Sequence, residues 1–126
     1  MKITAFLHAS LLVSDLCKAR EFYEDVLGLA PTSDRPDLGF EGVWYAMGNQ
    51  QIHLLALPNP DPVSGRPPHG GRDRHIALGV ASIEQARQAM DAAGIPYTQS
   101  RSGRAALFCR DPDGNAVELI QSTING

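Results

Sequence analysis

The 126-residue sequence lacks the features that mark membrane-spanning, exported and nucleic-acid-binding proteins. No apolar run approaches the roughly 20 residues that a membrane-spanning helix requires. Residues 1–7 show neither the apolar region nor the cleavage site of a signal peptide. The formal net charge is −3, so bulk electrostatics attract the chain neither to nucleic acid nor to an anionic membrane. We therefore expect a chain with neither of these as a partner.

Cysteine is also scarce, which excludes a disulfide-stapled scaffold. The two cysteines, Cys17 and Cys109, lie far apart, and neither belongs to a CxxC or zinc-finger spacing. A small disulfide-dependent domain needs several cysteine pairs, so we expect both thiols to be reduced. A reduced cytoplasmic setting is the corresponding expectation for localisation.

What the sequence does contain is a weak internal repeat with a period of about half the chain. His8 and His75 each open an apolar stretch, with Leu three residues on and Val two residues further. Each stretch then reaches a helix-capping residue, Asp15 or Ser82. Repeats of this size indicate two copies of one structural unit. At this length we expect a single domain, residues 1–126, in which the two halves share a core.

Residues 1–57 are predicted to form one strand, one helix and further strands. The helix has apolar residues at helical spacing and is expected to end at Gly28. A two-residue Gly-Asn turn at Gly48 predicts a hairpin. The expected elements of this first module are a strand at 3–13, a helix at 16–27, a short strand near the start of 31–39, and strands at 40–47 and 50–57.

Residues 75–126 are predicted to repeat this order as a second module. Residues 58–74 contain five prolines and are interpreted as a linker or surface loop, with His69 exposed within it. The expected elements of the second module are a strand at 75–80, a helix from Ser82 to Gly94, and strands at 97–99, 105–110 and 115–121. The fold class is therefore α+β, with two βαβββ modules.

Four imidazole or carboxylate groups occupy equivalent positions in the two modules. His8 and His75 open the first strands, whereas His53 and Glu118 lie in the last strands. A carboxylate in an apolar strand must be paired, bound to a metal or solvated. A pseudo-twofold axis would bring the four groups together as ligands of one divalent ion, with zinc, nickel, iron, cobalt and manganese all compatible. In the hairpin register set by the Gly48 turn, Trp44 lies opposite His53.

The sequence resembles the vicinal oxygen chelate superfamily, also called the glyoxalase/bleomycin-resistance/dioxygenase family. The residues that carry the resemblance span most of the chain: His8-x-x-Leu11-x-Val13-x-Asp15-Leu16-x-x-Ala19-x-x-Phe22-Tyr23-x-x-x-Leu27-Gly28-Leu29, Ile52-His53-Leu54-Leu55, His75-Ile76-Ala77-Leu78-x-Val80 and Asp111-Pro112-Asp113-Gly114-Asn115-x-x-Glu118-Leu119. The resemblance implies an open, cup-shaped mixed sheet with helices on its outer face. It also implies a metal held by His8, His53, His75 and Glu118, and a homodimer whose sites are shared between chains.

The reaction stays open between several activities of this family. The first expectation is a metal-dependent, glyoxalase-like lyase or isomerase acting on a small oxygen-rich carbonyl compound or its thiol conjugate, with Glu118 as catalytic carboxylate. Glyoxalase I commonly has a glutamate at the position of His53, so this residue is a departure. The alternatives are a non-enzymatic protein that sequesters a drug or toxin, as in bleomycin resistance, a thiol transferase, and a ring-cleaving dioxygenase. Candidate substrate-binding residues are Trp44, Phe40, Arg101 and Arg104.

Overall fold

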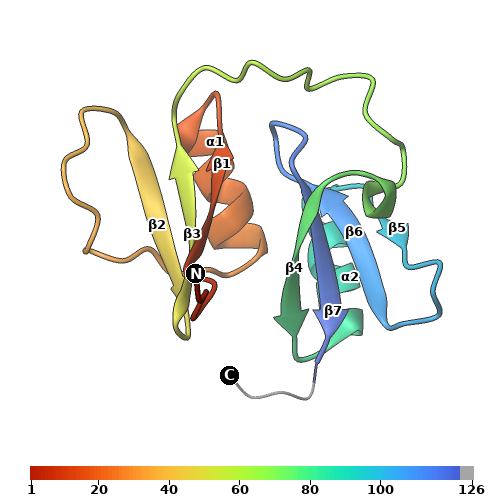
Figure 1. Ribbon diagram of the computed structural model, residues 1–126. Helices are drawn as coiled ribbons and strands as arrows, with labels where there is room; N and C mark the ends of the chain where they lie inside the picture. Colours follow the sequence, from red (N-terminus) through yellow and green to blue (C-terminus); the bar gives the residue numbers. More distant parts are fainter. Residues whose placement is uncertain (123–126) are drawn as a thin grey trace. The chain divides into compact units, whose positions relative to one another are not determined.

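The structure is a computed structural model that describes residues 1–122, and it contains two compact units. The first unit is Met1–Asn59 and the second is Pro60–Gly126, of which residues 123–126 lie outside the described part. Each unit combines a small mixed sheet with a helix (Figure 1). The α+β class and the two repeated modules that the sequence predicts are confirmed.

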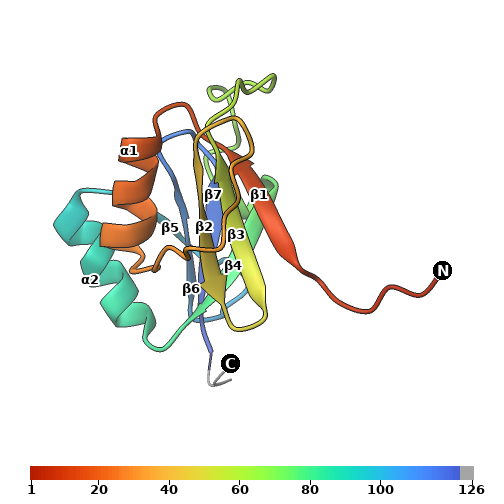
Figure 2. The same ribbon diagram turned by 90° about the vertical axis from the view of Figure 1, so that its left-hand side faces the viewer.

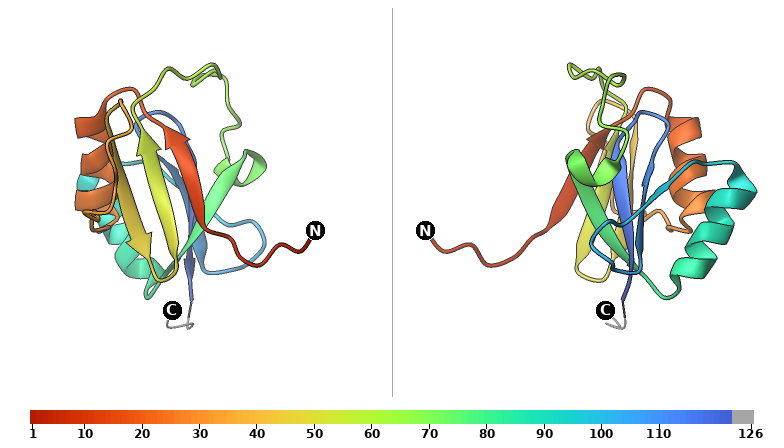
Figure 3. Two further views of the ribbon diagram at one scale, coloured as in Figure 1. Left: turned by 60° about the vertical axis from the view of Figure 1, so that its left-hand side comes forward. Right: turned by 90° about the vertical axis from the view of Figure 1, so that its right-hand side faces the viewer.

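The first unit has a sheet of three strands, one of them central. Its elements are β1 (His8–Leu12), α1 (Leu16–Arg20), the π-helical turn η1 (Glu21–Val26), β2 (Gly42–Met47) and β3 (Gln50–Leu55). The strand order is β1-β3-β2, with β1 parallel and β2 antiparallel to β3 (Figure 3, left). The hairpin predicted at Gly48 joins β2 to β3. Because β3 is central, its side chains lie beside those of both neighbouring strands.

The helix of the first unit begins and ends where its sequence predicts, but it changes type on the way. Asp15 caps its start and accepts a hydrogen bond from the Lys18 main-chain N–H at 3.1 Å. The second half widens into a π-helix, in which the Leu27 N–H donates to the Phe22 carbonyl five residues back. Gly28 follows with a φ of 78°, the left-handed conformation that favours glycine at a helix end.

A buried hydrogen bond ties this helix to the sheet. The fully buried Tyr45 on β2 donates its phenol proton to Glu24 Oε2 at 2.8 Å. Glu24 also pairs with Arg20 one helical turn earlier, and this hydrogen bond lowers the pKa of Glu24 against the opposing effect of burial. Burial and the hydrogen bond to Glu24 together raise the pKa of Tyr45. Helix and sheet are thus joined by a carboxylate that must stay ionised.

Acid should weaken the first unit through Glu24. A carboxylate whose folded pKa is lowered adds stability above its ordinary pKa, near 4.5, and loses it as the pH falls through the folded value. We expect the wild-type unfolding free energy to fall below this pH by about 1 kcal/mol more than that of Glu24→Gln. Urea unfolding between pH 3 and 7 measures both profiles. Glu21→Gln removes an exposed carboxylate from the same helix as a control, and parallel profiles of wild type and Glu24→Gln would contradict the expectation.

The second unit has a sheet of four strands, two of them inner strands. Its elements are the 3-10 turn η2 (Gly70–Arg72), β4 (His75–Val80), α2 (Ile83–Ala93), β5 (Thr98–Gln99), β6 (Ala106–Arg110) and β7 (Ala116–Gln121). The order is β4-β7-β6-β5, with only the β4–β7 pair parallel (Figure 3, right). Ser82 caps α2 by accepting from the Gln85 N–H at 3.2 Å, and Gly94 ends it with a φ of 68°.

Each unit has its own apolar core between helix and sheet. In the first unit the largest fully buried side chains are Tyr23, Tyr45 and Leu54. In the second unit they are Met90, Leu107 and Val117. Both cysteines are free, as the sequence predicts. Within residues 1–122 the longest helix has 11 residues, and none is long and apolar enough to span a bilayer.

Two predictions about the elements are wrong, and a third gains detail. The strand expected at 3–13 is limited to His8–Leu12, and the preceding segment runs away from the sheet with Ile3 and Phe6 exposed (Figure 2). The strand expected near residue 31 is reduced to a single bridge between Pro31 and Tyr45. Residues 58–74, predicted as a linker or surface loop, contain the short turn η2 and an internal ion pair between Arg66 and Asp73, and Asp73 also pairs with Arg110 on β6. In the first two cases, no strand of the described first unit pairs with the predicted strand over its whole length.

Candidate functional site

Three aromatic rings form a stack on the sheet of the first unit. Trp44 on β2 is paired with His53 on β3, as the hairpin register predicts, and their rings are 4.0 Å apart and nearly parallel. His8 on β1 covers His53 as well, with ring centroids 4.1 Å apart and an angle of 18° between the planes. The stack joins all three strands of this sheet, and His53 is its middle member.

His53 is held in a defined state within the stack. Its side chain is only 7% exposed, and its Nε2 donates to Gln51 Oε1 at 2.7 Å. Burial, followed by the positive charges of His8 and Arg35, lowers the pKa of His53. The ring is therefore neutral over a wider pH range than a solvated histidine, which is the form that binds a metal ion.

The stack forms one wall of a hollow of about 550 Å³ in the first unit. The hollow combines aromatic faces with amide groups, a lining typical of small-molecule sites. Its lining residues are Leu7, His8, Trp44, Gly48, Asn49, Gln51 and His53. Phe40, which the sequence suggests as a substrate contact, does not line it; its ring lies under Arg35 instead, whose side chain also donates to the Phe40 carbonyl.

A histidine and a carboxylate face each other on the sheet of the second unit. Glu118 lies on the central strand β7 and is 3% exposed. Its Oε1 is 3.3 Å from Nε2 of His75, which opens the neighbouring strand β4. His75 pairs with Ala116 in the parallel register, so Glu118 is the diagonal neighbour two residues along on the same face. The polar pair therefore results directly from the strand register.

The tautomer of His75 follows from its other nitrogen. His75 Nδ1 is 2.8 Å from the Asp73 main-chain carbonyl, which can only accept, so Nδ1 carries a proton. Nε2 and the Glu118 carboxylate then confront each other as two lone-pair groups unless a cation lies between them. A proton or a metal ion between these two atoms would relieve the unfavourable contact. An imidazole whose far N–H is bonded to a carbonyl is the usual arrangement of a metal-binding histidine.

The second carboxylate oxygen of Glu118 is also paired. Arg104 donates to Glu118 Oε2 at 3.1 Å, and its Nε donates to Ser102 Oγ at 3.0 Å. The Arg104 side chain is 57% exposed, so the pair is accessible to solvent on the arginine side. Arg104, a substrate-binding candidate on sequence grounds, thus contacts the proposed catalytic carboxylate. Arg101 is exposed in the same loop.

The two units repeat this arrangement at equivalent strand positions. In the first unit His8 pairs with Gln51, and His53 is the diagonal neighbour two residues along β3. In the second unit the same diagonal joins His75 to Glu118. The residue opposite the last-strand group is aromatic in both cases, Trp44 in one and Phe108 in the other. The sequence equivalence of the two pairs is therefore a structural equivalence. That all four groups bind one ion stays a prediction.

The donor groups suit a borderline divalent metal. Imidazole nitrogens and a carboxylate bind such ions at about 2.0–2.2 Å, which separates two ligand atoms by roughly 2.9–3.5 Å. The 3.3 Å between His75 Nε2 and Glu118 Oε1 lies in this interval. His8 and His53 are suitable metal ligands in their chemistry, but their present orientation does not suit a shared ion. Their stacked rings direct the in-plane lone pairs alongside each other and not toward one point. Within either unit, residues 1–122 contain no group of three or more potential ligands.

His69 differs from its sequence-based expectation. It was expected at the surface, but it is 7% exposed and shares a 2.6 Å hydrogen bond with Thr98 Oγ1. Its ring meets Phe108 edge-on, and Phe108 in turn meets His75 edge-on. Burial, followed by Arg101, Arg72 and His75, lowers the pKa of His69. His69 is therefore a buried residue beside Phe108, near the pair formed by His75 and Glu118, and not a surface residue.

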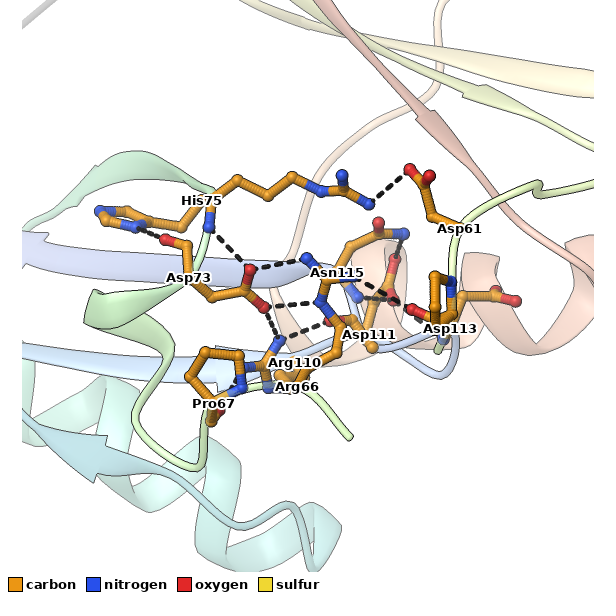
Figure 4. Close-up of polar contacts among 12 residues, drawn as sticks. Asp61, Arg66, Pro67, Asp73, His75, Arg110, Asp111, Asp113 and Asn115 are labelled. Carbon is orange, nitrogen blue, oxygen red and sulfur yellow. Dashed lines mark hydrogen bonds and ion pairs between the residues drawn. The ribbon is translucent and has the colours of Figure 1, made fainter. Parts of the chain in front are cut away.

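Sequence reasoning missed a group of charged residues close to His75 in the chain. Asp73 lies two residues before His75, and its buried carboxylate pairs with Arg66 and Arg110 (Figure 4). The only sequence signal is a set of charges in a proline-rich segment, which ordinarily indicates a solvated loop. The contact between Asp73 and Arg110 spans 37 residues and is not visible as a local pattern.

Known proteins share this sequence pattern and this fold. The family model described as Glyoxalase/Bleomycin resistance protein/Dioxygenase superfamily matches residues 5–119. A lactoylglutathione lyase of Haemophilus influenzae is 33% identical over 127 residues, covering 92% of this chain and 91% of that protein. A candidate glyoxalase family protein from Bacillus anthracis superposes with a TM-score of 0.78 at 24% identity, covering 98% of both chains. An antibiotic binding protein from Streptomyces sp. CB03234 gives a TM-score of 0.73 at 22% identity, covering 98% of this chain and 99% of that one.

Proposed function

Because the chain belongs to the glyoxalase/bleomycin resistance protein/dioxygenase superfamily, we propose that it is a metal-dependent lyase or isomerase of the glyoxalase type. Its substrate would be a small oxygen-rich carbonyl compound or the thiol conjugate of one. The lactoylglutathione lyase of Haemophilus influenzae supports this class, because its name describes a hydroxyacyl group carried on a thiol.

The observation that supports the proposal best is the pair formed by His75 and Glu118. A buried carboxylate oxygen lies 3.3 Å from Nε2 of an imidazole, and a main-chain carbonyl accepts a hydrogen bond from Nδ1 of the same ring. Such a pair is suited to a cation, and it offers a carboxylate that can exchange a proton with a bound substrate. Metal binding and acid–base chemistry are thus provided at one point.

The ligands proposed for the ion are His8, His53, His75 and Glu118. The first two belong to the first unit, and the other two belong to the second unit. The bound ion would supply Lewis-acid polarisation of adjacent substrate oxygens. The stack in the first unit must open for His8 and His53 to bind, which requires His8 to turn away from His53. His8 is exposed and lies at the edge strand β1, so this rotation moves no buried group.

The remaining roles belong to residues of the chain itself. Glu118 takes a proton from the carbon beside the substrate carbonyl and returns it to the neighbouring carbon. Arg104 leaves Glu118 Oε2 to pair with an anionic group of the substrate, for which its exposed side chain is suited. Trp44 provides an apolar wall for the substrate in the hollow beside His53. A homodimer would let one unit of each chain complete the site of the other.

Metal analysis of the purified protein tests the proposal. We expect one divalent ion per chain after purification without chelators, and a loss of affinity of about 100-fold or more in His75→Ala. Elemental analysis and calorimetric zinc titration measure the two quantities, and gel filtration with light scattering measures the dimer. His69→Gln is the matched control, because it alters another buried histidine beside the same Phe108. Wild-type protein that neither retains nor takes up a divalent ion would refute the metal role.

A second candidate function is the sequestration of a flat organic molecule. The observation in its favour is the aromatic stack, in which the His53 ring lies between those of His8 and Trp44 and leaves a flat aromatic surface. The Streptomyces protein of the same fold is an antibiotic binding protein. This function predicts tight binding of an aromatic antibiotic to the chelator-treated protein, with no chemical change of the ligand. The lyase function predicts that chelation abolishes turnover of the substrate.

A further inference from the structure

The segment before His75 is clamped by two arginines. Asp73 accepts two hydrogen bonds from Arg66, both at 2.7 Å, and one from Arg110 Nη1 at 2.9 Å (Figure 4). The Arg74 main-chain N–H donates to the same carboxylate at 2.8 Å. The Asp73 side chain is 6% exposed, so these bonds lie in a shielded environment. The carboxylate therefore cannot rotate without breaking several charge-assisted bonds.

The arginines are themselves anchored to main-chain oxygens. Arg66 donates to the Pro62 carbonyl, and Arg110 donates to the carbonyls of Pro67 and Gly114 at 2.6 and 2.7 Å. These bonds connect the proline-rich segment to β6 and to the turn that follows it. The Asp73 N–H donates to the Gly70 carbonyl at 3.1 Å. The main-chain N–H and the carboxylate of Asp73 are thus both hydrogen-bonded.

One group of Asp73 remains for a further role, its carbonyl oxygen. It accepts the hydrogen bond from His75 Nδ1 at 2.8 Å and so determines which imidazole nitrogen faces Glu118. We propose that Arg66, Asp73 and Arg110 form a positioning device that holds His75 as the Nδ1–H tautomer with Nε2 directed at Glu118. The proposal deepens the proposed function, because the orientation prepares His75 as a metal ligand.

A purely structural role for the same contacts makes a different prediction. If the arginines only attach the proline-rich segment, the imidazole state should not depend on them. A solvated neutral histidine exists as a mixture of both tautomers, so an unconstrained His75 would show both. The tautomer of His75 is therefore the quantity that separates positioning from attachment, and it can be measured without any metal.

Nitrogen NMR on the chelator-treated protein provides the test. Long-range proton–nitrogen correlation spectra of histidine-labelled protein identify the protonated nitrogen, and His75→Gln assigns the signal. For wild type, at a pH at which the imidazole is neutral, we expect a single Nδ1–H form. In Arg66→Lys and Arg110→Lys we expect a mixture, because lysine keeps the charge but cannot form the paired or branched hydrogen bonds of arginine. In each variant the other arginine still neutralises Asp73, which preserves the fold.

Arg74→Lys is the matched control. Arg74 belongs to the same segment and pairs with Asp61, but its side chain is exposed and does not contact the Asp73 carboxylate. It should retain the single Nδ1–H form. The proposal is overturned if wild type shows the Nε2–H form, or if folded Arg66→Lys and Arg110→Lys both keep the wild-type tautomer. If both variants unfold, the wild-type spectrum still decides whether the carbonyl selects the tautomer.

Zinc titration of the same variants separates this inference from the proposed function. A displaced partner of a ligating histidine typically costs 10–100-fold in metal affinity, so we expect about that loss in Arg66→Lys and Arg110→Lys. If the wild-type chain binds no zinc, the proposed function fails, whereas the tautomer measurement still decides the positioning role. If zinc binds equally to wild type and variants while the tautomer shifts, positioning is supported and its purpose as metal preparation is refuted.

Discussion

Replacement of Glu118 by glutamine should reduce solvent proton exchange at the substrate by about 10²–10⁴-fold, the usual contribution of a general base. Glutamine has the same shape but can neither accept a proton at neutral pH nor offer an anionic ligand. It would also leave Arg104 without its carboxylate partner. The metal content should fall in parallel, because one of the four proposed ligands loses its charge.

Deuterium incorporation measures this effect. The assay supplies a 2-oxoaldehyde with glutathione in deuterated water and detects deuterium in the lactoyl product by mass spectrometry. Glu84→Gln is the control, because Glu84 belongs to an exposed pair with Arg87 on α2. Unchanged exchange and unchanged metal content in Glu118→Gln would remove Glu118 from both roles.

Truncation of the central-strand leucines should have the largest effect on stability. Leu54 on β3 is fully buried, and Leu119, its repeat equivalent on β7, is 3% exposed. Each leucine directly follows the polar residue of its pair, His53 or Glu118, and faces the opposite side of its sheet. Leu54→Ala and Leu119→Ala should each lower the unfolding free energy by about 2–5 kcal/mol, because the lost side chain leaves a cavity.

Urea unfolding followed by circular dichroism measures the change. Leu38→Ala is the control, because Leu38 is exposed, and its effect should lie within about 0.5 kcal/mol of zero. A cost below about 1 kcal/mol for either buried leucine would contradict its place in the core of that unit.

The sequence predicts the strand pairs of the site because two short-range rules act together. Alternation along a strand determines the face of each side chain, and the Gly48 turn determines the hairpin register. These rules are sufficient for Trp44 opposite His53, which the structure confirms. The repeat extends them to the second unit, where His75 and Glu118 occupy the diagonal that His8 and His53 occupy in the first.

The misses have a common physical cause, which is that they depend on tertiary partners. Residues 3–6 have an apolar strand-like pattern but are not paired with a strand of the first unit, so the pattern alone predicted too long a strand. His69 lies in a proline-rich segment, and only its contacts with Thr98 and Phe108 bury it. The hydrogen bonds that hold the Asp73 carboxylate include one from Arg110, which is remote in sequence.

Trp44 gives the protein an internal optical probe. It is the only tryptophan among the 126 residues, and it lies 4.0 Å from the His53 ring in a nearly parallel arrangement. Its fluorescence therefore originates at one defined point of the chain, next to a histidine that quenches indole emission more strongly when protonated. Any event that separates the two rings or protonates His53 changes the emission. Rapid-mixing fluorescence can thus follow ligand entry on the unlabelled wild-type chain, with each rate assigned to one residue.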